Sequence, residues 1–97
     1  MASFSGFNLG ATGRALDKVC TALALPPVPP SPFLPPGPNG EKPYGTKQTY
    51  DHIIFVMEKV GCPVGEFRGY HVSNYAYAFQ YLAKFLLSTK RLPENFF

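Results

Sequence analysis

Three residues of the types used in nucleophilic catalysis, Asp51, His52 and Cys62, lie close together in this sequence. A cysteine becomes a catalytic nucleophile when a histidine takes its proton and a third group orients that histidine. Here the aspartate and the histidine are adjacent, so on a helix they point to different sides. The cysteine lies beyond the end of that helix. We therefore expect these three residues not to form a catalytic unit.

The carboxylates and glycines give no stronger catalytic signal. Glu58 and Glu66 could be paired as a general acid and base, but solvated surface carboxylates are the expected interpretation. No glycine-rich stretch is followed by the Lys and Ser or Thr of a phosphate-binding loop. We therefore expect no enzymatic activity, no cofactor and no small-molecule substrate.

Cys20 and Cys62 are the only cysteines of the 97-residue chain. They form neither a disulfide scaffold nor the paired motif of a zinc site. We expect two small buried thiols. A disulfide between them, and metal binding together with His52 and His71, are the alternatives.

The composition predicts a protein that contacts other molecules. Hydrophobic residues make up 45% of the chain and charged residues only 15%, against about 25% charged residues in typical soluble domains. Apolar side chains left on the surface are expected to face a protein partner or lipid headgroups. The net charge is +3, but the basic residues are scattered, so the clustered footprint of a nucleic-acid-binding protein is missing. We expect no nucleic-acid partner.

No segment predicts a membrane span, because none reaches about 18 uncharged apolar residues. Residues 70–87 come nearest, but they include His71 and Lys84. The N-terminal stretch "MASFSGFNLGATGRALDKV" has no acidic residue before Asp17 and resembles an organellar targeting segment.

The spacing of the apolar residues and the position of the prolines predict a mostly α protein of three amphipathic helices with a long extended proline-rich linker and no large independent core. We expect an N-terminal amphipathic helix in residues 1–25, the linker in 26–45 and a helical pair with a C-terminal tail in 46–97. The first helix is expected from Asn8, its N-cap, to Ala24, with its end at Pro26. The glycines at its start are either loop residues or points where another backbone approaches closely.

The linker contains "PPVPPSPFLPPGP", residues 26–38. Polyproline II rises about 3.1 Å per residue, so this segment predicts a semi-rigid spacer of roughly 40 Å. Phe33 and Leu34 are apolar side chains suited to grooves of a partner. "PPVPPSP" also contains the P-x-x-P spacing that aromatic-lined domains recognise.

The second helix is expected from Thr46 or Thr49 to Val60, with Gly61 as its stop. The third is expected from Ser73, its N-cap, to Thr89. Its apolar residues form nearly two faces, which is typical of an enclosed helix. We expect the apolar side chains of both helices and of the linker to bind a partner: Phe33, Leu34, Ile53, Ile54, Met57, Tyr77, Phe79, Tyr81, Leu82, Phe85 and Leu86.

One short segment carries a family resemblance. "TGRALDKVC", residues 12–20, resembles the N-terminal helix of mitochondrial γ-carbonic-anhydrase-like subunits of plant-type complex I, with the pattern Thr-Gly-x-Ala-Leu-Asp-base-apolar-Gly. Cys20 departs from that pattern. The β-helix repeats and metal histidines of the family are absent, so the resemblance implies no activity. It implies an amphipathic helix packed near the mitochondrial inner membrane. The overall layout is also similar to small accessory subunits of complex I or of algal-type ATP synthase.

From these patterns we expect a non-catalytic structural accessory subunit that bridges and stabilises subunits of a mitochondrial inner-membrane oxidative-phosphorylation complex. Its partners would be other subunits of that large membrane protein complex, with lipid headgroups as a further contact. The isolated chain would then fold poorly. The alternative is a free adaptor that displays the proline-rich motif to a polyproline-binding domain.

Overall fold

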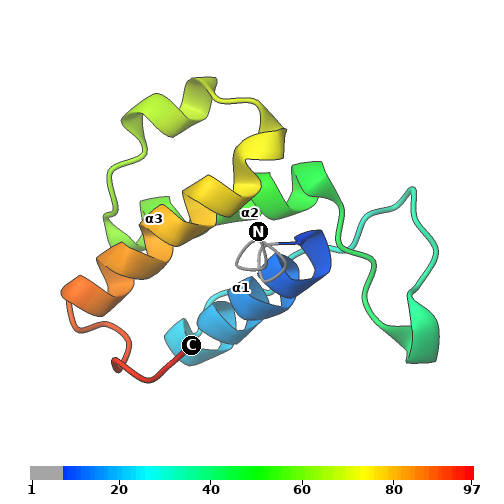
Figure 1. Cartoon of the computed structure of the whole chain (residues 1–97), viewed down its shortest axis with the longest axis horizontal. Coiled ribbons are helices and arrows are strands. Elements are labelled where there is room, and N and C mark those ends of the chain that lie inside the picture. Colours follow the sequence, from blue (N-terminus) through cyan, green and yellow to red (C-terminus); the bar gives the residue numbers. More distant parts are fainter. Residues whose placement is uncertain (1–7) are drawn as a thin grey trace.

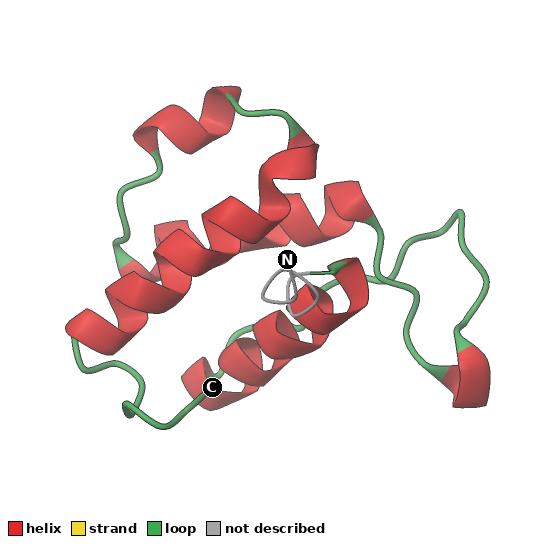
Figure 2. Ribbon diagram, viewed as in Figure 1, coloured by secondary structure: helices red, strands yellow, loops and turns green. Residues whose placement is uncertain are grey.

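The elements follow one another as helix α1 (Leu9–Leu23), helix α2 (Thr46–Val60) and helix α3 (Tyr75–Ser88), with three short 3-10 turns between them. These turns are η2 (Pro38–Gly40), η3 (Gly65–Gly69) and η4 (Val72–Asn74). The computed structural model describes residues 8–97, so the beginning of the targeting-like stretch lies outside the described residues. Within 8–97 every regular element is helical (Figure 2).

Helix α1 begins at the N-cap that the sequence predicts. Asn8 Oδ1 accepts a hydrogen bond from Ala11 N at 2.7 Å, which satisfies one of the N–H groups that lack a partner at a helix start. At the other end Ala24 adopts a left-handed conformation with φ 57°. Leu25 N then donates to Cys20 O at 2.8 Å, the closing bond of a Schellman-type end.

Helix α2 also ends as predicted. Gly61 has φ 78°, and Cys62 N donates to Met57 O at 2.9 Å. The start of α3 differs from the prediction, because Ser73 is not its N-cap. Ser73 N instead donates to His71 Nδ1 at 3.1 Å inside the turn η4, and α3 begins two residues later.

The three helices share one hydrophobic core, with α3 in front of α2 and alongside α1 in the view of Figure 1. Each helix contributes fully buried side chains, for example Leu16, Ile53 and Leu82, and the connecting segments add Val28 and Phe67. The expectation of a chain without a large independent core is therefore wrong. Five of the apolar side chains that we assigned to a partner, Ile53, Met57, Phe79, Leu82 and Leu86, are buried inside the chain instead.

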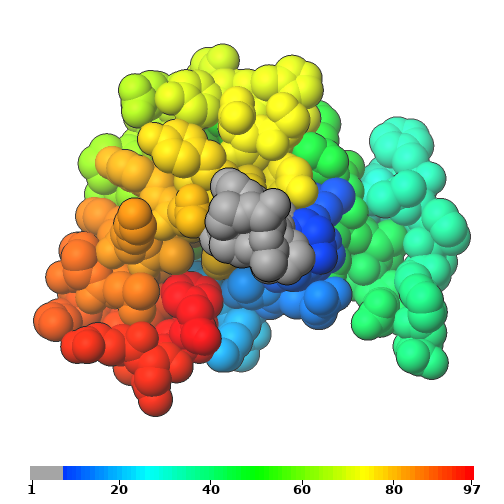
Figure 3. Space-filling model, in the orientation of Figure 1, coloured from blue at the N-terminus to red at the C-terminus, as the bar shows by residue number. Residues whose placement is uncertain are grey.

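The proline-rich segment is not an extended spacer. The described part of the chain measures only 36 × 32 × 30 Å, and the segment bends back on itself, as the loop beside the helices shows (Figure 1). Residues 26–31 lie against the helices, with Val28 1% exposed. The chain then leaves the body and returns at residue 43, where Ser31 N donates to Pro43 O at 2.9 Å. In the space-filling view this loop stands out from the body (Figure 3).

Gly13 decides between the two interpretations of the early glycines. It lies inside α1 and is buried, and the ring of Tyr44 packs directly over its Cα. A methyl group at this position would overlap the ring. Gly13 is therefore a helical glycine that lets the end of the proline-rich loop approach the helix backbone.

Candidate interaction surfaces

The eleven residues predicted to bind a partner divide into a core set and a surface set. The core set is buried within the chain: Ile53, Met57, Phe79, Leu82 and Leu86. Ile54 and Phe85 are half-buried against that core. The surface set is exposed: Phe33 (87%), Leu34 (48%), Tyr77 (50%) and Tyr81 (38%). In this fold the core set cannot touch a partner, because the helices bury those side chains against one another.

Phe33 and Leu34 form the apolar tip of the loop between Ser31 and Pro43, which we call the proline loop. Prolines on both sides restrict its backbone, because each fixes φ near −65°. Phe33 N donates to Ser31 Oγ at 3.2 Å, and Gly37 N donates to Glu41 O at 2.8 Å. The loop therefore presents its tip in a conformation that its own backbone supports.

A charged cluster ties the base of the proline loop to α1. Asp17 Oδ1 accepts from Val28 N at 2.8 Å, and Oδ2 accepts from Tyr44 Oη at 2.6 Å and pairs with Lys42 Nζ at 2.7 Å. Lys42 Nζ also donates to Val28 O at 2.8 Å. One carboxylate thus holds both ends of the loop at the same point of the helix.

This cluster shifts the pKa values of Asp17 and Tyr44. Burial raises the pKa of Asp17, but the hydrogen bonds from Lys42, Tyr44 and Val28 N outweigh it, and the pKa lies below the ordinary value of 3.8. The pKa of Tyr44 is raised by burial and by the hydrogen bond to the Asp17 carboxylate. Both shifts favour a charged aspartate beside a neutral phenol at neutral pH.

The backbone of the prolines explains why the segment can lie against the body. In residues 26–32 only Val28 and Ser31 have an N–H group. Both N–H groups are paired, the first with Asp17 and the second with Pro43 O. Pro26 O lies 2.7 Å from His52 Nε2. A segment with few donors to satisfy can lie against the body without a sheet or helix. Val28 and Ser31 face the body, whereas the prolines of "PPVPPSP" remain exposed.

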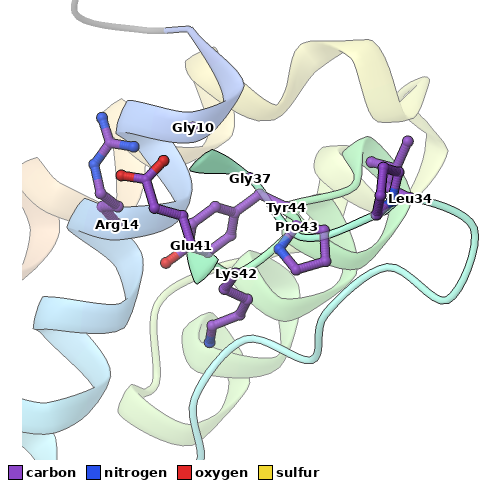
Figure 4. Close-up of a pocket in the computed structure, with 9 residues that line it drawn as sticks. Gly10, Arg14, Leu34, Gly37, Glu41, Lys42, Pro43 and Tyr44 are labelled. Atoms are coloured by element: carbon purple, nitrogen blue, oxygen red, sulfur yellow. The ribbon is translucent and has the colours of Figure 1, made fainter. Parts of the chain in front are cut away.

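A hollow of about 350 Å³ lies at the foot of the proline loop (Figure 4). Arg14 of α1 and Glu41 lie toward one end, and Leu34 lies at the other. Lys42, Pro43 and Tyr44 form its floor together with glycines of both segments. The hollow is wide and open, so it extends the surface around the tip and does not enclose a ligand.

A second exposed surface, the tyrosine patch, consists of Tyr70, Tyr77 and Tyr81 around the buried Phe67. Ring centroids lie 5.2, 5.5 and 4.9 Å from Phe67 for the three tyrosines in that order. Tyr70 and Tyr77 are nearly parallel, at 17° and 6.2 Å. Such rings have an apolar body and a polar tip, which suits a protein interface.

The catalytic trio considered in the sequence is held by other partners. His52 bonds Pro26 O and stacks on Phe55 at 4.9 Å. Asp51 pairs with Lys47 at 2.6 Å on the surface.

Cys62 is buried and free, as is Cys20, which confirms the prediction of two buried thiols. Burial raises the pKa of Cys62, and burial and the nearby Asp17 charge raise that of Cys20 to about 11. Neither thiol is set up as a nucleophile.

Residues 8–97 contain no group of three or more His, Cys, Asp or Glu residues arranged to hold a metal ion. None of their helices is long and apolar enough to cross a membrane. Comparisons of the chain with known protein families, with curated proteins and with solved structures gave no match.

Sequence reasoning missed the cluster that holds the loop. Asp17, Lys42 and Tyr44 are far apart in the sequence and form no motif. The one available signal was Asp17 itself, the single acidic residue of α1, on a helix whose other charges are basic.

Proposed function

We propose that this protein is a non-catalytic structural subunit of a larger assembly, which it contacts through the tip of the proline loop and through the tyrosine patch. One observation is the main support: Phe33, a large apolar side chain, is 87% exposed at the end of a loop that is fixed to the body. An apolar side chain held out in water costs free energy unless a partner covers it.

The anchoring of the loop supports a binding role over an accidental exposure. Ordering a flexible loop on binding costs conformational entropy, roughly 1–2 kcal/mol per residue. The bonds from Asp17, Ser31 and Gly37 meet much of that cost during folding. A preorganised tip therefore binds with more of its burial free energy available for affinity.

The assembly that we propose is a mitochondrial inner-membrane oxidative-phosphorylation complex, complex I or ATP synthase. The support is the resemblance of residues 12–20 to the helix of γ-carbonic-anhydrase-like subunits, together with the low content of charged residues. The apolar face of that helix packs inside the protein. Contact with the assembly is therefore assigned to the loop tip and the tyrosines.

The test is the native size of the tagged full-length protein after mild detergent extraction. Migration with a respiratory complex, identified by mass spectrometry of the band, is the expected result. The double substitution Phe33→Ser and Leu34→Ser should release the protein from the complex, whereas Lys90→Gln, an exposed change away from the loop, should not. Circular dichroism of each variant shows whether the fold is intact.

Migration of the wild-type protein as a small free species would refute the proposal. Release by Lys90→Gln as well as by the loop substitutions would show that the tip is not the contact. The alternative, an adaptor that displays "PPVPPSP", predicts binding of a polyproline-reading domain. Val28 and Ser31 are buried in the motif but its prolines are exposed, so such a domain would bind the face of the segment that points away from the body.

A further inference from the structure

The excess positive charge of the chain is concentrated around its C-terminal tail, residues 89–97. The tail and the helix surfaces beside it carry one acidic residue, Glu94, and four basic ones: Lys18, Lys84, Lys90 and Arg91. Together these give +3, the net charge of the whole chain, because the remaining five basic and five acidic residues cancel. Three of those remaining basic residues are neutralised in ion pairs: Lys42 with Asp17, Lys47 with Asp51 and Arg68 with Glu58.

The tail is tied to both α1 and α3. Lys18 Nζ of α1 donates to Phe96 O at 2.6 Å and lies 4.6 Å from the centre of the Phe96 ring. The Phe97 ring meets Phe96 at 5.0 Å and Phe79 of α3 at 5.8 Å, edge-on in both cases. In the space-filling view the red tail lies beside the orange end of α3 and the blue α1 (Figure 3). Residues of three segments therefore form one surface, which we call the tail face.

The other three cations border an apolar groove on this face. The groove, of about 300 Å³, lies between α1 and α3, and Lys84, Leu87 and Phe97 are among its lining residues. Lys90 and Arg91 lie in the turn that ends α3, where Lys90 N donates to Leu87 O at 3.1 Å. All three cations are exposed. None of them forms an ion pair within residues 8–97.

The tail face combines two properties that an anionic lipid surface matches. Phe97 is 53% exposed, and its ring has no polar tip, so it suits the boundary between headgroups and acyl chains. The side chains of Lys84, Lys90 and Arg91 make no hydrogen bond that would fix them within residues 8–97. Long cationic side chains of this kind can reach phosphates at varying positions. A fluid headgroup layer offers such positions, whereas the groups of a folded protein partner are fixed.

We propose that the tail face binds the surface of a bilayer that contains anionic lipids. Phe97 and Leu87 lie at the headgroup boundary, and the four cations face lipid phosphates, each attracted by the negative surface potential. This inference rests on the membrane setting of the proposed function and adds a contact that the assembly itself does not require. Extraction in detergent does not report on the tail face, because detergent replaces the lipid.

Flotation of the purified full-length protein with lipid vesicles tests the proposal without any complex present, so it can fail independently of the proposed function. The probes are vesicles of neutral phosphatidylcholine and vesicles that also contain phosphatidylglycerol, an anionic lipid. We expect the protein to partition onto the anionic vesicles and only weakly onto the neutral ones. Added salt should reduce the difference, because it screens the attraction between exposed charges.

Two double substitutions separate the position of the charge from its amount. Lys84→Gln with Arg91→Gln should lower the partition coefficient on anionic vesicles about fivefold for each charge removed, the contribution of one basic residue near an anionic membrane. Lys47→Gln with Arg68→Gln removes the same charge from exposed ion pairs elsewhere, with side chains 72% and 55% exposed. This matched control should leave the partition coefficient nearly unchanged.

A pair of phenylalanine substitutions tests the apolar contact. Phe97→Ser should weaken partition severalfold, and Phe97→Leu, which keeps an apolar side chain, should restore most of it. Phe33→Ser removes a more exposed phenylalanine from the proline loop and should have no effect on vesicle binding. Circular dichroism establishes that each variant is folded.

Three results would overturn the proposal. Equal partition onto neutral and anionic vesicles would show that the charges of the tail face do not meet headgroups. Equal losses for the two double variants would show that net charge alone, and not this face, governs binding. Soluble polyglutamate that binds as tightly as the vesicles, with Phe97→Ser without effect on either, would show that the face fits an acidic protein instead of lipid.

Discussion

The substitution Asp17→Asn tests whether one carboxylate fixes the proline loop. In the wild-type protein Oδ1 accepts from Val28 N at 2.8 Å, while Oδ2 serves Tyr44 Oη at 2.6 Å and Lys42 Nζ at 2.7 Å. An asparagine has one acceptor oxygen and an NH₂ group that donates. Whichever way the amide turns, its NH₂ group faces at least one of the donors that the carboxylate accepted from: Val28 N on one side, or Tyr44 Oη and Lys42 Nζ on the other.

The expected decrease in the free energy of unfolding follows from the interactions of Asp17 that the substitution removes. A hydrogen bond to a charged group contributes about 1.5–3 kcal/mol, and an unpaired buried N–H such as that of Val28 costs about 1–3 kcal/mol. The Lys42 and Asp17 side chains are 27% and 21% exposed, so the ion pair is partly screened and adds less. We expect Asp17→Asn to lower the free energy of unfolding by about 2–3 kcal/mol.

The matched control is Asp51→Asn. Asp51 also pairs with a lysine, Lys47, at 2.6 Å, but the side chains are 53% and 72% exposed. Exposed pairs one helical turn apart contribute about 0.3–0.5 kcal/mol. Urea unfolding followed by circular dichroism measures both variants, because the sequence has no tryptophan to report by fluorescence. If Asp17→Asn lowered the free energy of unfolding only as little as Asp51→Asn does, the assignment of Asp17 as the anchor of the loop would be refuted.

The same carboxylate predicts an acid dependence. The pKa of Asp17 is lower in the folded protein than its ordinary 3.8, so between the two values the unfolded chain binds more protons. Its contribution is therefore complete above about pH 3.8 and is lost as the pH falls through the folded pKa. The Asp17→Asn variant should lack this part of the acid destabilisation, and an unchanged acid profile would contradict the prediction.

Two further predictions concern helix α1. Gly13→Ala should destabilise the protein by about 1–3 kcal/mol because the new methyl group overlaps the Tyr44 ring. Gly10→Ala, whose methyl group would meet only the end of the Arg14 side chain and the Asn8 Oδ1 atom, should be neutral or stabilising by up to about 1 kcal/mol in the same urea assay. Cys20 has its pKa raised from 9.0 to about 11, so stability should fall between pH 9 and 11 as the unfolded thiol ionises first. A Cys20→Ala variant that kept the full alkaline slope would contradict this.

The sequence alone determined the features that depend on neighbours along the chain. The apolar periodicity around Leu16 and Ile53 predicted the first two helices. Asn8 predicted the start of the first helix and Gly61 the end of the second, because caps act on backbone groups within one turn. The exposed members of the candidate surface, Phe33 and Tyr77, were also chosen from sequence, since apolar side chains between prolines or with a polar tip suit an interface.

Only the tertiary structure decided which apolar faces meet inside the chain. Periodicity shows that Met57 and Leu82 belong to apolar faces, but it does not show whether a partner or another helix covers them. The path of the proline segment likewise depends on Asp17, which reaches Val28 and Tyr44 across 11 and 27 residues. Such contacts form only when packing brings distant segments together, so no local pattern records them, and a segment that reads as a 40 Å spacer becomes an anchored loop.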